Sequence, residues 1–253
     1  MTLSKTIAGF MFSTLSLAAS TASAAIVDDV TIDFEDMTFA AYYGKANIAP
    51  EADGTCAGAG SAGCYLTAGA AIGTVSNPDP NAHLHRYDGD DSTLLQYHPD
   101  SPGIYVRAQD STSFSLKSLE FYAPIKNANP GTGPDDLWEI IGFNTALNPD
   151  LSSGDGTNYD SAVAYQTVAN GFEGVLNLDS SFADIDAFWI HYKGYPIVPQ
   201  DGKRFDLRID NLVLGAAAAT PAPVPVPAAV WLFGTGLMGL VSLGRKKARS
   251  VAA

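Results

Sequence analysis

The chain has 253 residues, 16% of them charged, and a formal net charge of −13 at pH 7. All 27 acids lie between residues 28 and 210, whereas five of the 14 bases lie in the two end segments, so the part between carries nine bases and a net charge of −18. Because phosphate contacts need clustered Lys and Arg, we expect no nucleic-acid partner. Two explanations of the acidity stay open, the solubility of an exported protein and an attraction for divalent cations.

The N-terminal segment has the parts of a secretory signal. Lys5 precedes an apolar stretch at 7–19, and Ala22-Ser23-Ala24 fits the small-residue rule for cleavage. We therefore predict a signal peptide at 1–24, with an uncleaved anchor as the alternative. Residues 25–214 are then one domain of ordinary size, large enough to bury a sizeable core.

The two cysteines, Cys56 and Cys64, both lie in the exported part. An oxidising compartment favours a disulfide between them, which closes a small ring. A ring of this size stabilises the folded state by roughly 2–3 kcal/mol in the loop-entropy model. Neither cysteine lies beside a base that would activate it, so a thiol catalyst is not expected.

Short β-rich segments separated by Gly, Asn, Asp and Pro recur between the two ends, and no amphipathic helix of convincing length interrupts them. Many short strands with turn signals between them are typical of an all-β sandwich or barrel. We predict an all-β fold, a jelly-roll-like antiparallel β-sandwich. The predicted strands are 30–34, 65–67, 71–75, 83–87, 93–97, 104–108, 114–122, 138–144, 162–167, 174–178, 188–192 and 204–214.

Three segments carry finer information. The apolar phase of 114–122 shifts by one residue between Leu116 and Leu119, which indicates a β-bulge. Residues 187–192 are apolar on both faces, as expected for a central strand. The last segment predicts a half-buried strand with a wet face. Its expected inner residues are Phe205, Leu207, Ile209 and Val213, and its expected outer residues are Asp206, Arg208 and Asp210.

Carboxylates alternate with apolar residues in the first and last predicted strands, in T-I-D-F-E-D at 31–36 and F-D-L-R-I-D-N-L at 205–212. In many jelly rolls these two strands lie side by side, where like charges repel unless Arg208 or a Ca²⁺ ion compensates them. The motifs resemble those of non-catalytic carbohydrate-binding modules of the β-sandwich type, in which an early F-E and a late I-D-N frame a structural calcium. The resemblance implies calcium at Glu35 and Asp210, and a solvated polar face is the alternative.

Aromatic side chains at strand ends and turns are candidates for stacking on sugar rings. Trp138 follows the acidic run P-D-D-L, and Tyr192 and Tyr195 flank the turn K-G. We predict these three as ligand-binding residues, with packing in the core as the alternative. Trp189, within an apolar run, is expected in the core.

Motifs of a hydrolase are missing from the sequence, which contains no G-x-S-x-G, no P-loop and no H-E-x-x-H. Cleavage of a glycan needs two carboxylates about 5–9 Å apart across a cleft. Glu120 and Glu139 in β segments and Glu173 in a turn are interpreted as ordinary surface acids. A non-catalytic module is therefore expected, with a secreted glycan-degrading enzyme as the alternative.

His83 and His85 share one strand face, where they are either a metal pair or surface histidines.

The C-terminal segment has three parts. An Ala/Pro-rich linker at 215–227, typical of an extended spacer, precedes an uncharged apolar run at 228–244. This run would be about 25 Å long as a helix, at the short end of what spans a bilayer. A basic tail at 245–253 follows at once. We predict one transmembrane helix with a cytoplasmic basic end, so that the domain faces outward, and a buried core helix is the alternative.

The order of proline motif, apolar run and basic end resembles the PEP-CTERM class of sorting signals, in its VPLPA-CTERM variant. The resemblance covers V-P-V-P-A-A-V-W-L-F-G-T-G-L-M-G-L at 224–240 and the bases that follow, and its motif residues are Val224, Pro225, Val226, Pro227, Ala228 and Ala229. It implies recognition by an exosortase, a membrane protease that would cut near the proline motif. The protein would first be anchored in the inner membrane facing the periplasm. It would then reach the cell surface, the outer membrane or the exopolysaccharide matrix of a Gram-negative bacterium.

The two end signals and the acidic, strand-rich domain together predict an exported, exosortase-sorted surface or matrix protein. Its expected work is non-catalytic, either binding exopolysaccharide or forming structure. A matrix protein that self-associates through its sheet edges, without affinity for glycans, is a further possibility.

Overall fold

The computed structural model describes residues 25–38, 41–50, 56, 63–75, 83–88, 93–97, 103–123, 137–151, 161–193 and 207–218. The chain divides into two units, Met1–Ala217 and Ala218–Ala253, and every element below belongs to the first. The predicted signal peptide, sorting motif, transmembrane helix and basic tail all lie outside the described residues. Within the described ranges, no helix is long and apolar enough to cross a membrane.

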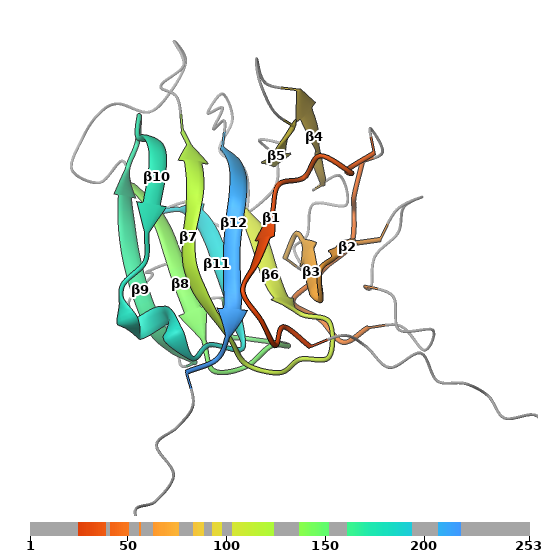
Figure 1. Ribbon diagram of the computed structural model, residues 1–253, viewed down its shortest axis with the longest axis vertical. Helices are drawn as coiled ribbons and strands as arrows, with labels where there is room; N and C mark the ends of the chain where they lie inside the picture. Colours follow the sequence, from red (N-terminus) through yellow and green to blue (C-terminus); the bar gives the residue numbers. More distant parts are fainter. Residues whose placement is uncertain are drawn as a thin grey trace, which may run out of the picture. The chain divides into compact units, whose positions relative to one another are not determined.

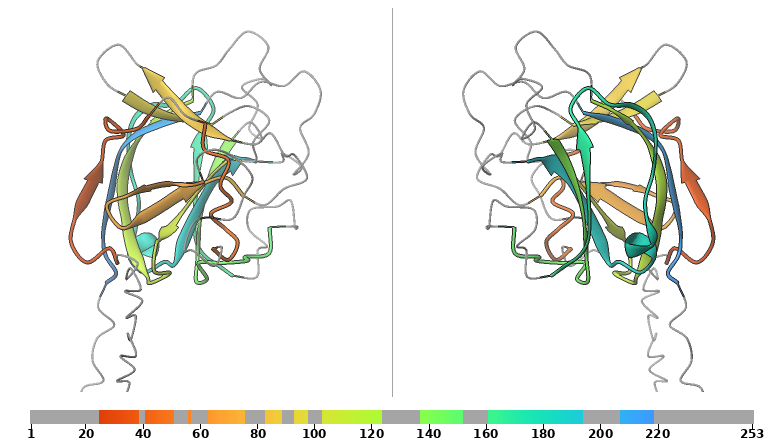
Figure 2. Two further views of the ribbon diagram at one scale, coloured as in Figure 1. Left: turned by 90° about the vertical axis from the view of Figure 1, so that its right-hand side faces the viewer. Right: turned by 90° about the vertical axis from the view of Figure 1, so that its left-hand side faces the viewer.

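Two antiparallel sheets, packed as two layers, make up the described part of the fold (Figures 1 and 2). Sheet 1 has the strand order β10-β7-β12-β5-β4, with β1 also paired to β12, and sheet 2 has the order β2-β3-β6-β11-β8-β9. Each predicted segment overlaps one strand, so the prediction of an all-β sandwich is confirmed. The strands are β1 (Val30–Ile32), β2 (Tyr65–Thr67), β3 (Ala70–Gly73), β4 (Leu84–Asp88), β5 (Thr93–Tyr97), β6 (Ile104–Ala108), β7 (Phe114–Tyr122), β8 (Leu137–Phe143), β9 (Ala162–Ala169), β10 (Glu173–Asn177), β11 (Ala187–Tyr192) and β12 (Arg208–Ala216), and a 3₁₀ helix, η1 (Ser180–Ala183), precedes β11.

The main core lies between the two sheets, because each strand turns every second side chain inward. In sheet 1 the inward residues include Phe121 of β7 and Ile209 of β12, and in sheet 2 they include Val106 of β6 and Phe188 of β11. All four side chains are inaccessible to solvent. Complete burial of such a side chain contributes about 1.5–3 kcal/mol each, so this layer is the principal source of stability.

Sheet 2 is buried on its outer face as well. A second apolar cluster there includes Tyr105 of β6, Trp189 of β11 and Ile141 of β8, together with the two cysteines. Every residue of β11 is buried, which confirms the prediction of a central strand at 187–192. Its two neighbours in the sheet, β6 and β8, are also almost wholly buried, and so is β3 on the other side of β6.

The disulfide between Cys56 and Cys64 is confirmed, with a Cα–Cα distance of 5.5 Å. It packs on β3 at Gly73, where an added Cβ would lie 2.5 Å from the carbonyl oxygen of Gly44 and 2.8 Å from Sγ of Cys64. Only glycine permits so close an approach. The disulfide therefore belongs to the layer that covers the outer face of sheet 2.

Two irregularities in the pairing of β7 with β12 redirect the side chains of sheet 1. The register shifts between Val213 and Leu214, opposite the predicted change of phase in β7, so that β-bulge is confirmed. A second shift follows Asp210, where Asn211 has a positive φ of 43°. Leu212 and Leu214 are therefore buried, while Val213 is only half-buried, and the prediction that Val213 faces inward is wrong.

Candidate functional site

The first and last strands lie side by side, as predicted, with Ile32 of β1 opposite Leu212 of β12. The two carboxylates expected to hold calcium differ in environment, because Glu35 is exposed whereas Asp210 is 1% exposed. Oδ1 of Asp210 accepts the N–H of Asn211 at 2.7 Å. Among the described residues no group of three or more His, Cys, Asp or Glu is placed to hold a metal ion. A calcium ion needs six to eight oxygens, so these residues alone do not form a calcium cage.

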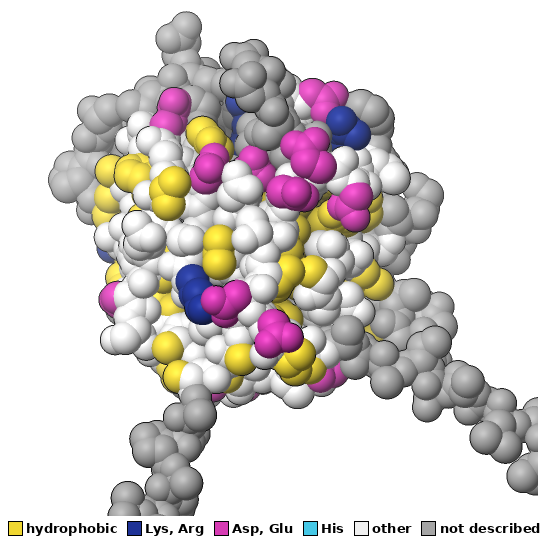
Figure 3. Space-filling model, viewed as in Figure 1, with side chains coloured by type: hydrophobic (Ala, Val, Ile, Leu, Met, Phe, Trp, Pro, Cys, Tyr) yellow, Lys and Arg dark blue, Asp and Glu magenta, His cyan; other side chains and the backbone are white. Residues whose placement is uncertain are grey.

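Several polar side chains of β7, β10 and β12 lie together on the outer face of sheet 1, next to Val175 of β10, which is 59% exposed. The pairing places Arg208 beside Tyr122 and Tyr122 beside Glu173, while Asp210 lies beside Glu120 in the neighbouring row. Figure 3 shows acidic side chains gathered on the upper part of the side of the molecule that carries these strands. We call Glu120, Tyr122, Glu173, Arg208, Asp210 and Asn211 the polar face, and of these Asp210 is buried, at 1% exposure.

Contacts within the polar face hold the Glu120 carboxylate in position. The hydroxyl of Tyr122 donates to Oε2 of Glu120, and Nδ2 of Asn211 donates to Oε1 at 3.1 Å. The hydrogen bond to Glu120, with partial burial, raises the pKa of Tyr122 to about 12, so the phenol stays neutral and remains a donor. The guanidinium of Arg208 lies 3.6 Å from the centre of the Tyr87 ring on β4, which fixes the direction of this long side chain.

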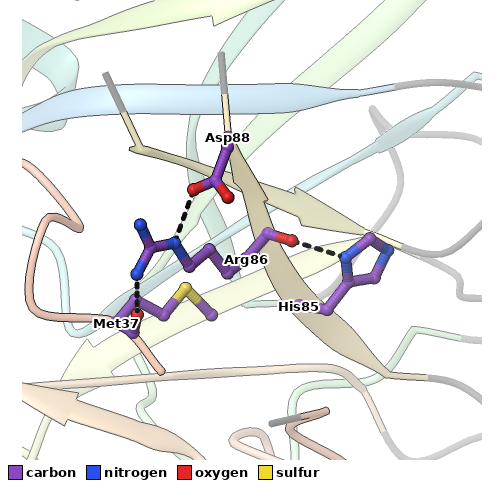
Figure 4. Close-up of polar contacts among 4 residues, drawn as sticks. All are labelled: Met37, His85, Arg86 and Asp88. Carbon is purple, nitrogen blue, oxygen red and sulfur yellow. Dashed lines mark hydrogen bonds and ion pairs between the residues drawn. The ribbon is translucent and has the colours of Figure 1, made fainter. Parts of the chain in front are cut away.

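The far edge of sheet 1 carries a second set of polar contacts around β4 (Figure 4). Nε of Arg86 donates to Oδ1 of Asp88 at 2.6 Å, and Nη1 donates to the carbonyl oxygen of Met37 at 3.1 Å. Nδ1 of His85 lies 2.9 Å from the carbonyl oxygen of Arg86. These contacts tie β4 to the segment after β1, and the His85 imidazole contacts its own strand.

The outer face of sheet 2 contains a buried charged cluster that the sequence did not reveal. Glu139 of β8 is completely buried and lies opposite His191 of β11. Nε2 of His191 is 3.0 Å from Oε2 of Glu139, within ion-pair distance though not aligned as a hydrogen bond. The hydroxyl of Tyr165 on β9 donates to Oε1 at 2.5 Å, and Nζ of Lys193 lies 4.0 Å away. The His191 ring stacks on Trp189, with their centres 3.8 Å apart.

The electrostatics of this cluster keep Glu139 ionised. Burial by itself raises the pKa of Glu139, but the contacts with His191 and Tyr165 and the charges of His191 and Lys193 outweigh it and lower the pKa below its ordinary value. The interpretation of Glu139 as a surface acid is therefore wrong. Its setting in W-E-I-I, with His191 in W-I-H-Y, was the available signal, because an acid and a histidine inside apolar strands indicate a buried pair.

Two of the aromatic residues predicted to bind ligand are in the main core. Trp138 is 1% exposed and Tyr192 is 6% exposed, and their rings meet edge to face at 5.4 Å. Nε1 of Trp138 donates to Oδ1 of Asn170 at 3.4 Å. The premise that these rings are exposed is wrong, because both side chains turn toward the opposing sheet. Tyr195 lies outside the described residues.

Comparison with known proteins finds no matching family model and no matching curated protein. Among solved structures, the chain is similar to the crystallographic structure of the Clostridium thermocellum N-terminal endo-1,4-beta-D-xylanase 10B CBM22-1-GH10 modules complexed with xylohexaose. The sequence identity is 13% and the TM-score 0.27, and the match covers 75% of this chain and 30% of that chain. The chain thus spans less than a third of the protein that it matches, and a similarity of this size supports no conclusion about fold or function.

Proposed function

We propose that this protein is an exported, jelly-roll-like β-sandwich that an exosortase sorts to the cell surface or the exopolysaccharide matrix. The observation that carries the proposal is the order of proline motif, apolar run and bases at 224–249. Strand β12 ends at Ala216, before this signal begins. It is hydrogen-bonded on both sides, to β7 and to β1 and β5, all of which precede the tail in the chain. Cleavage near the proline motif would therefore remove no residue of a described strand.

The domain's work is non-catalytic recognition of a glycan or a structural role in the matrix. Hydrolysis of a glycosidic bond needs a carboxyl group whose pKa is raised so that it can donate a proton. Glu139 has the opposite property, since its pKa is lowered, and its contacts are a histidine, a tyrosine and a lysine. The buried cluster of sheet 2 therefore favours a structural role over acid catalysis.

The polar face of sheet 1 supports recognition of a glycan. Its Tyr122, Glu120, Arg208 and Asn211 side chains are all half-buried, so each offers solvent a fixed polar group. Hydroxyl-rich ligands are bound by a few fixed donors and acceptors beside aromatic surface. A glycan-degrading enzyme remains the alternative, and it would have to take its two carboxylates from a different arrangement than the Glu139 cluster.

Mass spectrometry of the mature protein's C-terminus tests the sorting part of the proposal. The protein would be isolated from cells with and without the processing protease, beside a variant with Pro225→Ala and Pro227→Ala. We expect loss of everything beyond the proline motif only when both the protease and the motif are intact. An intact tail in wild-type cells would contradict sorting and would leave a plain membrane-anchored protein.

A binding and hydrolysis assay on the mature protein tests the functional part. We expect retention on at least one polysaccharide of a panel that includes the producer's own, without release of reducing ends. Release of reducing ends would establish the enzyme alternative. Concentration-dependent sedimentation together with no retention on any polysaccharide would establish a structural matrix protein instead.

A further inference from the structure

The polar face runs across the strands of sheet 1, and this sets the direction in which a chain-like ligand would lie. Glu173, Tyr122 and Arg208 are direct partners on β10, β7 and β12. Adjacent strands are about 4.8 Å apart, so these side chains form a row perpendicular to the strands. In the row beside it, Glu120 lies between the buried Asp210 of β12 and the exposed Val175 of β10. An extended polymer laid across the strands along the first row would meet one polar group after another, with Glu120 beside it.

The negative charge of the polar face and of the surrounding domain favours a ligand with positive charge. Glu120 and Glu173 are the acids of the face that solvent reaches, Asp210 is buried at 1% exposure, and Arg208 is the one base among the six residues that define the face. Tyr122 and Asn211 direct one hydrogen bond each to the two oxygens of Glu120, and each carboxylate oxygen can accept a further bond. The surrounding domain carries −18, so an anionic polymer is repelled and a cationic one is attracted over its whole approach.

We infer that the polar face of sheet 1 binds a glycan with free amino groups, namely a polymer of hexosamines that are at least partly without their acetyl groups. Glu120 and Glu173 accept from the ammonium groups, Arg208 donates to hydroxyl oxygens, and the Tyr122 ring provides apolar surface for a sugar ring. This inference rests on the proposed function and deepens it by naming the surface and the chemistry of the ligand.

Titration of the mature protein with three soluble oligomers of equal length tests the inference, using glucosamine, N-acetylglucosamine and glucuronate oligomers as probes. We expect the tightest binding for the glucosamine oligomer. Binding should weaken steeply as salt rises to about 1 M, where the screening length falls to about 3 Å. The glucuronate oligomer should not bind, because the face and the domain repel it.

Two variants locate the site. Glu120→Gln keeps the shape, and its amide can accept from Asn211 while donating to the Tyr122 hydroxyl, but it removes the charge and should weaken glucosamine binding about tenfold, the usual effect of losing one charge-assisted contact. Asp184→Asn is the matched control, since it removes the same charge from an exposed residue after η1, outside the polar face. It should change affinity less than about twofold, and equal melting temperatures would exclude misfolding.

The outcomes separate this inference from the proposed function. Equal losses in the two variants, or no loss in Glu120→Gln, would overturn the site while recognition of a glycan stands. Preference for the acetylated or the acidic oligomer would overturn the ligand class in the same way. Failure to bind any of the three oligomers, together with failure on the polysaccharide panel, would overturn both.

Discussion

The outer faces of the two sheets carry the same kind of side chain in two opposite settings. Glu120 on sheet 1 is half-buried and accepts hydrogen bonds from a tyrosine and an asparagine. Glu139 on sheet 2 is fully buried beside a histidine and a lysine. The difference arises from what covers each face, since the second apolar cluster lies on sheet 2. A carboxylate under such cover must be neutralised internally, whereas one on the open face keeps acceptor capacity for a ligand.

Replacement of each carboxylate in turn should show the largest difference in stability between the two faces. We expect Glu139→Ala to lower the free energy of unfolding by about 3–5 kcal/mol, because it leaves His191 and Lys193 without the buried charge that they face. Glu120→Ala should cost about 1 kcal/mol or less, since Tyr122 and Asn211 can turn to water. Urea unfolding of both variants at pH 7 measures the two values, and similar losses would contradict the assignment of different roles.

Removal of the disulfide tests whether the apolar cluster on the outer face of sheet 2 causes the different settings of Glu139 and Glu120. Replacement of Cys56 and Cys64 by Ser together should cost about 2–3 kcal/mol through the entropy of the opened ring. Because the disulfide packs against β3 in the same layer as Trp189, hydrogen exchange should also quicken in β3 and β6 but not in β7 and β12. Unfolding in urea and exchange measured strand by strand provide the two readouts. Equal acceleration in both sheets would mean that the disulfide stabilises the whole domain rather than this cover.

Acidification should remove the contribution of Glu139 to the stability of the fold. Its pKa is lower in the folded protein than the unfolded value of about 4.3, so its contribution to stability is fully present above that pH. The contribution is lost as the pH falls through the lowered folded value. The urea midpoint of the wild type should therefore decline below about pH 4, and Glu139→Gln should decline less steeply over the same range. Parallel curves for the two proteins would show that Glu139 does not contribute to the acid sensitivity.

The strands of this fold could be predicted because their signals are local. Alternation of side chains and turn residues located every described strand within a few residues, and the change of phase in 114–122 predicted the bulge of β7. The pairing of β1 with β12 followed from the same fold class, and two cysteines in a domain predicted to be exported allowed one intramolecular disulfide.

The burial and the contacts of side chains on the two sheet faces could not be predicted in the same way. They depend on the register between strands and on which residues cover each sheet. Glu139 meets His191 and Tyr165 only when three strands distant in sequence align in one register. The inward turn of Trp138 likewise follows from the pairing of β8 within the sheet. In β12 the sequence I-D-N-L breaks the alternation with two consecutive polar residues, and our prediction missed this signal of the second bulge, which reverses the side of Val213.

Asn211 affects both the backbone of β12 and the polar face. Its replacement should separate the effect of the bulge from that of the side chain, and it is the smallest effect that we predict. Its φ of 43° is a left-handed conformation that costs glycine and asparagine less free energy than alanine, while its side chain donates to Glu120. Asn211→Ala loses the donor and strains the backbone, at a cost of about 2 kcal/mol, whereas Asn211→Gly loses only the donor, at about 1 kcal/mol or less. Both variants release the Glu120 carboxylate equally, so their affinities for the glucosamine oligomer should fall by the same factor while their stabilities differ. Urea unfolding beside oligomer titration measures this pair of effects, and affinities that track the two stabilities would mean that the bulge, rather than the asparagine amide, organises the face.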